Sequence, residues 1–226
     1  MMTPSQSSKA SSRGRKLVRH LTPWPTAIAA AAMVVACGGS DNGPGFLAFP
    51  SGSATPTTSG VVTGSYYRNA KVCIDANNNG RCDSGEASAT TDANGAFTLS
   101  GQGALVVEIG TSSKRFDPDT NTETAVTQPL VFRAPAAANG VVSAISTELV
   151  ALMDANGGNL AAARTALAAR LGVPEAQLLA DHNKISDPAI RTALQNEIDQ
   201  SIERIAEAVA EAGPGGDVIA ALRNRF

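Results

Sequence analysis

The stretch that most constrains the fold is residues 72–86, because it places oxygen-bearing side chains at alternate positions around a glycine. From Asp75 it reads D-x-N-x-N-G-x-x-D-x-x-E, which fulfils the twelve-residue calcium-loop template D-x-[DN]-x-[DN]-G-x5-E. Calcium takes about six to eight oxygens at roughly 2.3–2.6 Å, so the chain has to coil around it, and Gly80 stands where the coil turns sharply. The predicted ligands are the side chains of Asp75, Asn77, Asn79, Asp83 (directly or through water) and Glu86, and the main-chain carbonyl of Arg81.

The flanks of this loop indicate that a strand carries it. A helix–loop–helix hand needs an amphipathic helix before its first ligand, whereas residues 70–74 alternate and contain β-branched side chains. Cys73 and Cys82 bracket the first part of the loop, and in an oxidising compartment they would form a short disulfide that closes the coil. The competing interpretation is a polar turn around Asn-Asn-Asn-Gly that binds no metal.

The run V-C-I-D-x-N-x-N-G-x-C-D-x-G-E and the following T-T-D-A-N-G-A-F-T-L resemble known calcium-dependent modules. They are similar to exported bacterial lipoproteins of unassigned function, to the B-type repeat of serine-aspartate adhesins and to prealbumin-like modules. The resemblance covers residues 60–110 closely. It implies a small, calcium-stabilised β-sandwich with Asp75, Asn77, Asn79, Asp83 and Glu86 as ligands. One strand of the adhesin repeat is missing, because Thr90 follows Glu86 almost at once, so strand order cannot be transferred.

The N-terminus predicts export and a lipid anchor. Residues 1–36 have a basic start and then a short apolar segment, interrupted by Pro23 and Pro25, which is typical of a signal peptide. The segment ends V-V-A-C-G, which resembles a lipobox with Cys37 as the lipidated residue; an ordinary secretory signal is the alternative. Gly38 rather than aspartate follows Cys37, and by the same resemblance this indicates the outer membrane, on its periplasmic or surface face.

Charge and cysteine count agree with an anchored, acidic protein. Five of the 18 basic side chains and none of the 20 acidic ones lie in the signal peptide, so the remaining chain has a net charge of −7. This balance argues against nucleic acid as a partner and against membrane binding through the protein surface. If Cys37 carries lipid, the other two of the three cysteines are left to pair with each other.

The periodicity predicts an α+β fold in two parts. Residues 37–60 form a linker rich in Gly, Ser, Thr and Pro. A β-sandwich module is expected over 61–135, with strands at 60–66, 70–74, 96–99, 105–109 and 126–132. Asp92-Ala93-Asn94-Gly95 reads as a hairpin turn. Residues 116–123 are expected to be a solvated hairpin tip rather than a second metal loop.

In the predicted helical region, 141–226, apolar side chains recur with the helical period of about 3.6 residues. Ser143 or Ser146 is expected to cap a first helix, Asn159 a second over 160–171, and Pro174 to begin a short one. The longest helix opens at Asp187 and carries an apolar stripe for packing within the domain; a last helix follows Asp217. The stripe is formed by Ile190, Leu194, Ile198, Ile202, Ile205 and Val209.

No catalytic motif stands out. Past the signal peptide the only histidine is His182, which is expected at the surface or at a helix end, and G-x-S-x-G, G-x-G-x-x-G and G-x-x-x-x-G-K-[ST] motifs are absent. We therefore expect a non-catalytic, lipid-anchored envelope protein with a calcium-stabilised β-module and a structural or binding role. The alternatives are a glycan- or peptide-recognition module and an accessory domain of an envelope hydrolase.

Overall fold

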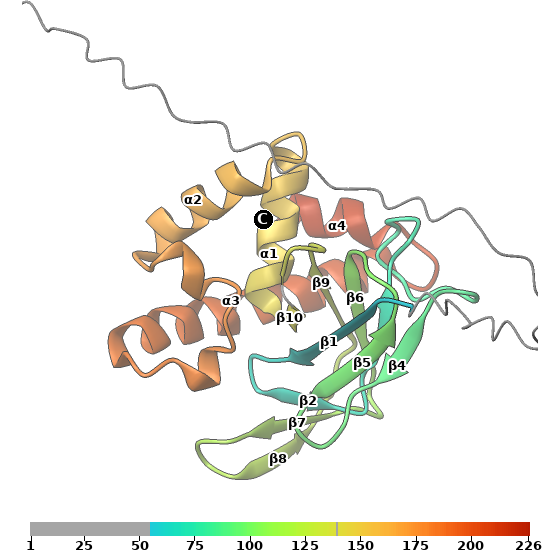
Figure 1. Cartoon of the computed structure of the whole chain (residues 1–226), viewed down its shortest axis with the longest axis horizontal. Helices are drawn as coiled ribbons and strands as arrows, with labels where there is room; N and C mark the ends of the chain where they lie inside the picture. Colours follow the sequence, from blue (N-terminus) through green and yellow to red (C-terminus); the bar gives the residue numbers. More distant parts are fainter. Residues whose placement is uncertain (1–54, 139) are drawn as a thin grey trace, which may run out of the picture. The chain divides into compact units, whose positions relative to one another are not determined.

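Strands fill the first half of the described chain and helices the second, which confirms an α+β fold (Figure 1). The computed structural model describes residues 55–138 and 140–226. The predicted signal peptide, the predicted lipidation at Cys37 and most of the predicted linker lie outside these residues.

Within the described residues the strands form three small sheets. The first has β1 at its centre, antiparallel to β5 and parallel to β10, and the other two sheets are antiparallel. Their bounds, in sheet order, are β10 (Val141–Val142), β1 (Thr57–Val62) and β5 (Ala96–Ser100); β2 (Tyr66–Arg68), β7 (Lys114–Asp117) and β8 (Thr122–Ala125); β4 (Ser88–Thr90), β3 (Lys71–Ile74), β6 (Leu105–Ile109) and β9 (Leu130–Ala134).

The strands expected at 70–74, 96–99 and 105–109 are confirmed as β3, β5 and β6. The strand expected at 60–66 instead begins at Thr57, within the predicted linker, and ends at Val62. It ends there because Gly64 and Ser65 have φ values of 123° and 136° that an extended strand does not allow. The strand expected at 126–132 begins later, at Leu130, after Pro129. The short strands β2, β4, β7, β8 and β10 were not predicted.

The two turns behave differently. Asp92 accepts hydrogen bonds from the N–H groups of Asn94 and Ala96 at 2.7 and 2.9 Å, as the turn prediction requires, but β4 and β5 on either side belong to different sheets. The expected hairpin tip is confirmed: β7 and β8 pair with each other, and β8 is exposed throughout.

Helices α1 to α4 cover the strands from one side (Figure 1). Their predicted caps are confirmed: the Ser143, Asn159, Asp187 and Asp217 side chains accept N–H groups of the following turn. The elements are α1 (Ala144–Ala155), α2 (Leu160–Leu171), the 3-10 turns η1 (Glu175–Gln177) and η2 (His182–Lys184), α3 (Pro188–Ala212) and α4 (Val218–Arg225).

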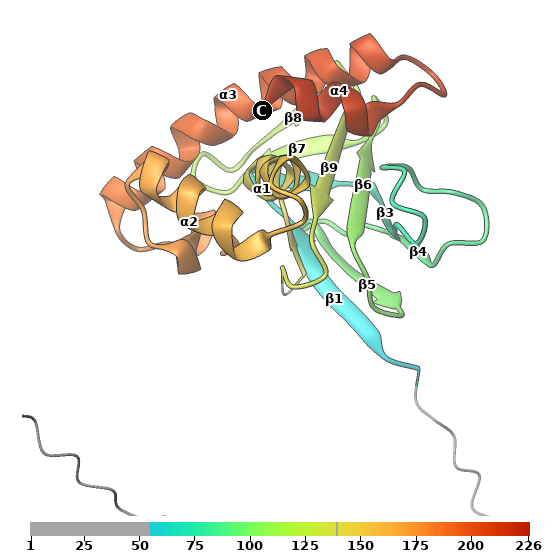
Figure 2. The ribbon, with the colours of Figure 1, turned by 90° about the horizontal axis from the view of Figure 1, so that it is seen from above.

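The apolar stripe of α3 packs inside the domain, as expected. Leu194, Ile198 and Ile205 are at most 1% exposed, and they join the same core as Phe132 of β9. Figure 2 shows α4 lying beside the C-terminal part of α3. None of the helices in the described part is both long and apolar enough to cross a membrane.

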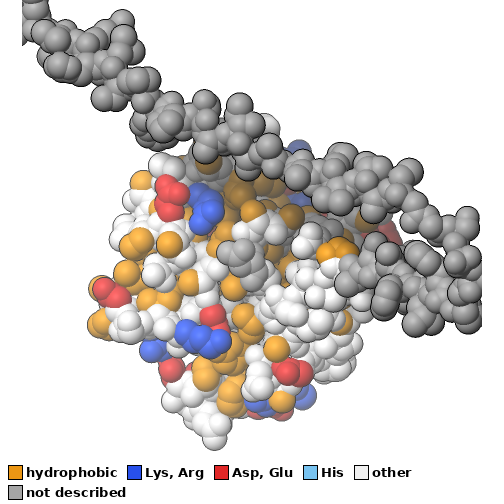
Figure 3. Space-filling view, viewed as in Figure 1, with side chains coloured by type: hydrophobic (Ala, Val, Ile, Leu, Met, Phe, Trp, Pro, Cys, Tyr) orange, Lys and Arg blue, Asp and Glu red, His pale blue; other side chains and the backbone are white. Residues whose placement is uncertain are grey.

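Charged side chains are interspersed on the surface. On the face in Figure 3, basic and acidic groups alternate and no large patch of one sign is seen. His182 begins η2, so the helix-end expectation is confirmed, but the side chain is only 5% exposed and is not at the surface.

Candidate functional site

The first half of the 75–86 loop coils around the Asp75 side chain. Asp75, which is 3% exposed, accepts the N–H of Asn79 at 3.0 Å on one carboxylate oxygen and the N–H of Gly80 at 2.9 Å on the other. The side-chain oxygens of Asn77 and Asn79 accept N–H groups two residues further on, at 3.1 and 2.9 Å. Gly80 turns the chain at φ 72°, a left-handed conformation that favours glycine.

Three of the predicted ligand side chains converge. The amide groups of Asn77 and Asn79 donate to the same carboxylate oxygen of Asp83, at 2.8 and 2.6 Å. These two hydrogen bonds lower the pKa of the Asp83 carboxyl. Asn77, Asn79 and Asp83 therefore form a small polar cluster that is held together by hydrogen bonds within the loop.

Glu86 closes the loop at its other end, but against the backbone. Its two carboxylate oxygens accept the N–H groups of Ala76 and Asp83, both at 2.9 Å. The carboxylates of Asp75 and Glu86 thus bind backbone N–H groups and do not join the Asn77–Asn79–Asp83 cluster.

The donor set matches the requirements of a hard cation only in part. In the region covered by residues 55–138 and 140–226, no three His, Cys, Asp or Glu side chains are grouped to hold a metal ion. The three carboxylates of the predicted set, Asp75, Asp83 and Glu86, are therefore not grouped. With two amides and a carbonyl they are all oxygen donors of the type that calcium prefers. The residues that would hold the ion are Asn77, Asn79 and Asp83, with Asp75, Glu86 and the Arg81 carbonyl completing the shell.

The disulfide predicted between Cys73 and Cys82 is present, with Cα atoms 5.5 Å apart, and it pins the loop to β3. The Cys82 N–H donates to Glu108 of β6 at 3.1 Å, and the Lys71 ammonium donates to the Cys82 carbonyl at 3.0 Å. The loop therefore folds back over the sheet that carries it and is held there from both sides.

The loop also contacts the turn between α3 and α4, and no sequence pattern predicted this contact. The Arg81 guanidinium donates to the carbonyls of Gly216 at 2.6 Å and Gly213 at 3.4 Å. A Cβ at Gly80 would lie 2.6 Å from Ile219 of α4. The predicted metal loop and the C-terminal helix are thus packed together.

A second polar cluster lies between helices α1, α2 and α3, and the sequence did not predict it. Glu148 of α1 and Glu197 of α3 are 3% and 5% exposed, and Arg170 of α2 bridges them. Arg204 also pairs with Glu197, and the Ser201 hydroxyl lies 3.3 Å from Glu148 and 3.4 Å from Glu197. The available signal was Glu148 itself, an acid on the helix face whose neighbours are apolar or small.

The two carboxyls of this cluster titrate differently. Burial, and then the neighbouring Glu197, raise the pKa of Glu148 to about 7. The pKa of Glu197 is lowered, against the opposing effect of burial, because Arg170 and Arg204 donate to it. Glu197 is therefore the carboxyl that stays charged beside the arginines, and Glu148 is the carboxyl that takes up a proton first as the pH falls.

His182 belongs to a third polar group. The Thr63 hydroxyl donates to Asp181 at 3.0 Å and lies 3.3 Å from His182 Nδ1, while His182 Nε2 is buried without a partner in the described chain. Burial lowers the pKa of His182 to about 4, so the ring is neutral. Thr63 is completely buried, so a substrate cannot reach this hydroxyl.

No family model, curated protein or solved structure matches this chain. The resemblance to calcium-dependent modules remains a prediction carried by the residues of the loop and of the turn after it.

Proposed function

We propose that the chain is a non-catalytic, lipid-anchored protein of the cell envelope whose β-rich part is stabilised by calcium in the 75–86 loop. The observation that carries the proposal is the loop itself: Gly80 in the left-handed region, side-chain oxygens capping successive N–H groups, and Asn77, Asn79 and Asp83 converging. Calcium would replace the amide–carboxylate contacts with oxygen contacts at one centre.

The role of the ion in this proposal is structural. The loop lies between β3 and the α3–α4 turn, so an ion that orders it would stabilise the contacts of both. A prealbumin-like sandwich is part of the same proposal. It is supported by Val72 and Val107 of one sheet sharing a core with Phe97 and Leu99 of another.

The calcium proposal is tested by melting a soluble form that begins at Gly38, with calcium or with EDTA. An ion that binds only the folded state at ten times its Kd adds about 1.4 kcal/mol, which raises Tm by about 3–5 °C for a chain of this size. With Kd near ~10⁻³ M, as in weak extracellular calcium modules, about 10 mM calcium is required.

Two variants separate the site from general charge effects. Glu86→Gln should abolish the calcium-dependent rise in Tm. Glu203→Gln, an exposed carboxylate on α3 outside the loop, should leave the rise intact. A Tm that is the same with about 10 mM calcium and with EDTA would reject the metal site.

The anchor is tested separately, by metabolic labelling with a radioactive fatty acid. Label should enter the full-length chain and should be lost in Cys37→Ala. Unlabelled wild-type protein would reject the anchor without touching the calcium proposal.

The alternative function is ligand binding. Stacking of a glycan on an exposed aromatic side chain is not favoured. Tyr67 is 1% exposed, and the Tyr66 hydroxyl donates to Asp181 at 3.0 Å, so neither presents a free aromatic platform. The observation that favours a binding role is a groove beside the loop.

A further inference from the structure

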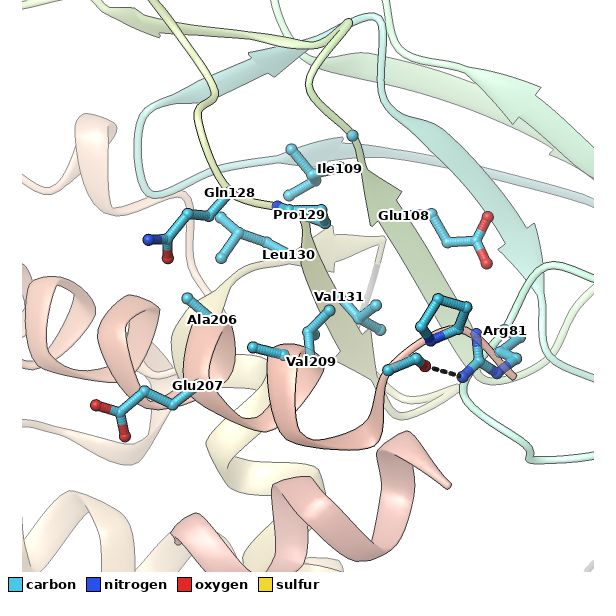
Figure 4. A pocket seen from close by; sticks show the side chains of 14 residues that line it. Arg81, Glu108, Ile109, Gln128, Pro129, Leu130, Val131, Ala206, Glu207 and Val209 are labelled. Atoms are coloured by element: carbon cyan, nitrogen blue, oxygen red, sulfur yellow. Dashed lines mark hydrogen bonds between the residues drawn. The ribbon is translucent and has the colours of Figure 1, made fainter. Parts of the chain in front are cut away.

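A groove of about 740 Å³ lies between α3, the β6 and β9 strands, and the 75–86 loop (Figure 4). Three separate parts of the chain form its walls: Arg81 from the loop, Glu108 to Gly110 and Gln128 to Val131 from the β-rich part, and the end of α3 with Pro214. Its volume falls in the range of about 300–1,000 Å³ that small-molecule sites occupy.

The long walls of the groove are apolar. Val131 of β9 and Val209 of α3 face each other across it, with Ala206, Leu130 and Pro129 alongside (Figure 4). Val131, Ala206 and Val209 are only half-buried by the described chain. An apolar ligand would remove this surface from water, at about 25 cal/mol per Å².

Arg81 and Glu108 lie at one end of the groove, and Gln128 and Glu207 lie at the other (Figure 4). Arg81 uses one guanidinium nitrogen, Nη2, for the Gly213 and Gly216 carbonyls, which leaves Nε and Nη1 without a partner among the described residues. One oxygen of Glu108, Oε1, accepts the Cys82 N–H, and the other has no described partner. The nearby Lys71 ammonium is directed to the Cys82 carbonyl instead.

This end of the groove is held in place before any ligand arrives. The Cys73–Cys82 disulfide fixes the residue next to Arg81, and the Cys82 N–H fixes the Glu108 carboxylate. The Arg81 hydrogen bonds tie the same segment to the end of α3. A preformed site loses less conformational entropy on binding.

We propose that this groove binds a small amphiphile with an aliphatic or aromatic body and an amide group at one end. The amide presents an N–H to the free oxygen of Glu108 and a carbonyl to the free nitrogens of Arg81, while the body lies between Val131 and Val209. A fatty carboxylate would pair with Arg81 but repel Glu108, and an alkylamine would pair with Glu108 but repel Arg81. An amide satisfies both neighbours without a net charge.

The test uses N-octylacetamide as the probe and N-methyl-N-octylacetamide, which lacks the N–H, as its matched partner. Binding is followed by NMR of the soluble chain in EDTA, so that the result does not depend on calcium. Saturable shifts are expected at the amides of Val131, Val209 and Glu108. The N-methyl compound should bind at least fivefold more weakly, because the Glu108 oxygen is then left unpaired.

Protein variants locate the site. Ala210→Glu places a charge on an exposed, helix-compatible position in the groove wall and should weaken binding at least tenfold. Ala169→Glu, at an exposed position of α2, should leave binding unchanged. Equal affinity for both compounds, shifts centred elsewhere, or no saturable shift up to the solubility limit would each overturn the proposal.

Discussion

The 75–86 loop and the Glu148–Glu197 cluster both consist of carboxylates with hydrogen-bonding partners, yet they are built in opposite ways. In the loop, every partner of Asp75, Asp83 and Glu86 lies within the same twelve residues, and most are backbone N–H groups. In the helix cluster, Glu148 and Glu197 are 49 positions apart in the chain and meet through Arg170 of a third helix.

The difference shows why one cluster was predicted and the other was not. A local hydrogen-bond pattern leaves a sequence signature, because spacing along the chain fixes spacing in space. A cluster built across three helices leaves no such signature. Its two carboxylates are also buried, so their charges must be paired, whereas most of the loop is at least partly exposed to water.

The largest expected effect in the described chain is loss of Arg170. Arg170→Met removes the bridge between two nearly buried carboxylates and should lower the free energy of unfolding by about 3 kcal/mol. Urea titration at pH 7.5 measures it. Arg225→Met, which removes a bridge to the exposed Glu207 and Glu211, should cost less than about 1 kcal/mol. Equal losses in the two variants would show that burial of the helix cluster does not matter.

The second effect concerns the free energy of unfolding, to which His182 and Glu148 should add pH dependences of opposite sign. The folded-state pKa of His182 lies below its unfolded value, so its contribution is present above about pH 6.5 and is lost as the pH falls to about 4. The folded-state pKa of Glu148 lies above its unfolded value, so its contribution is present below about pH 4.5 and is lost as the pH rises through about 7. Each amounts to as much as about 3 kcal/mol, and between pH 4.5 and 6.5 the two oppose each other.

Single variants should reveal how each residue changes the free energy of unfolding with pH. In His182→Gln the free energy of unfolding should fall relative to wild type as the pH rises from 4.5 to 6.5. In Glu148→Gln it should rise relative to wild type over the same interval. Urea titrations at three pH values give both slopes. Parallel curves for wild type and either variant would show that the group does not titrate as its burial implies.

The smallest expected effect tests the contact between the loop and α4. Gly80→Ala introduces a Cβ at φ 72° and within 2.6 Å of Ile219, whereas Gly172→Ala introduces one at φ 66° with nothing within 4 Å. Gly172→Ala should therefore cost about 1 kcal/mol from backbone strain alone, and Gly80→Ala about 1 kcal/mol more. Thermal melts of both variants make the comparison. Equal costs would mean that α4 yields freely and that the loop does not buttress it.

The helix boundaries were predictable because their signals are local. Asn159, Asp187 and Asp217 each cap the helix that follows, and Gly172 and Gly213 end helices at positive φ. The short strands β2, β4, β7, β8 and β10 were not predictable, because two to four residues carry too little pattern to separate a strand from a loop.

The burial of His182 could not be predicted either. Its neighbours in sequence are polar, which indicates a surface position. The ring is covered by residues distant along the chain, among them Thr63 in the turn between β1 and β2. The groove was missed for the same reason, because Arg81, Val131 and Val209 come from three segments.

The sequence by itself determined the α+β order of elements, the helix caps, the coil of the 75–86 loop and the disulfide that closes it. Each of these depends on contacts between residues close in the chain, or on a pair of cysteines with few alternatives. Only the tertiary structure decided that the loop rests on α4, that Glu148 and Glu197 share two arginines, and that an apolar groove ends at Arg81 and Glu108. Those features arise where distant segments pack, and one-dimensional spacing holds no information on which segments meet.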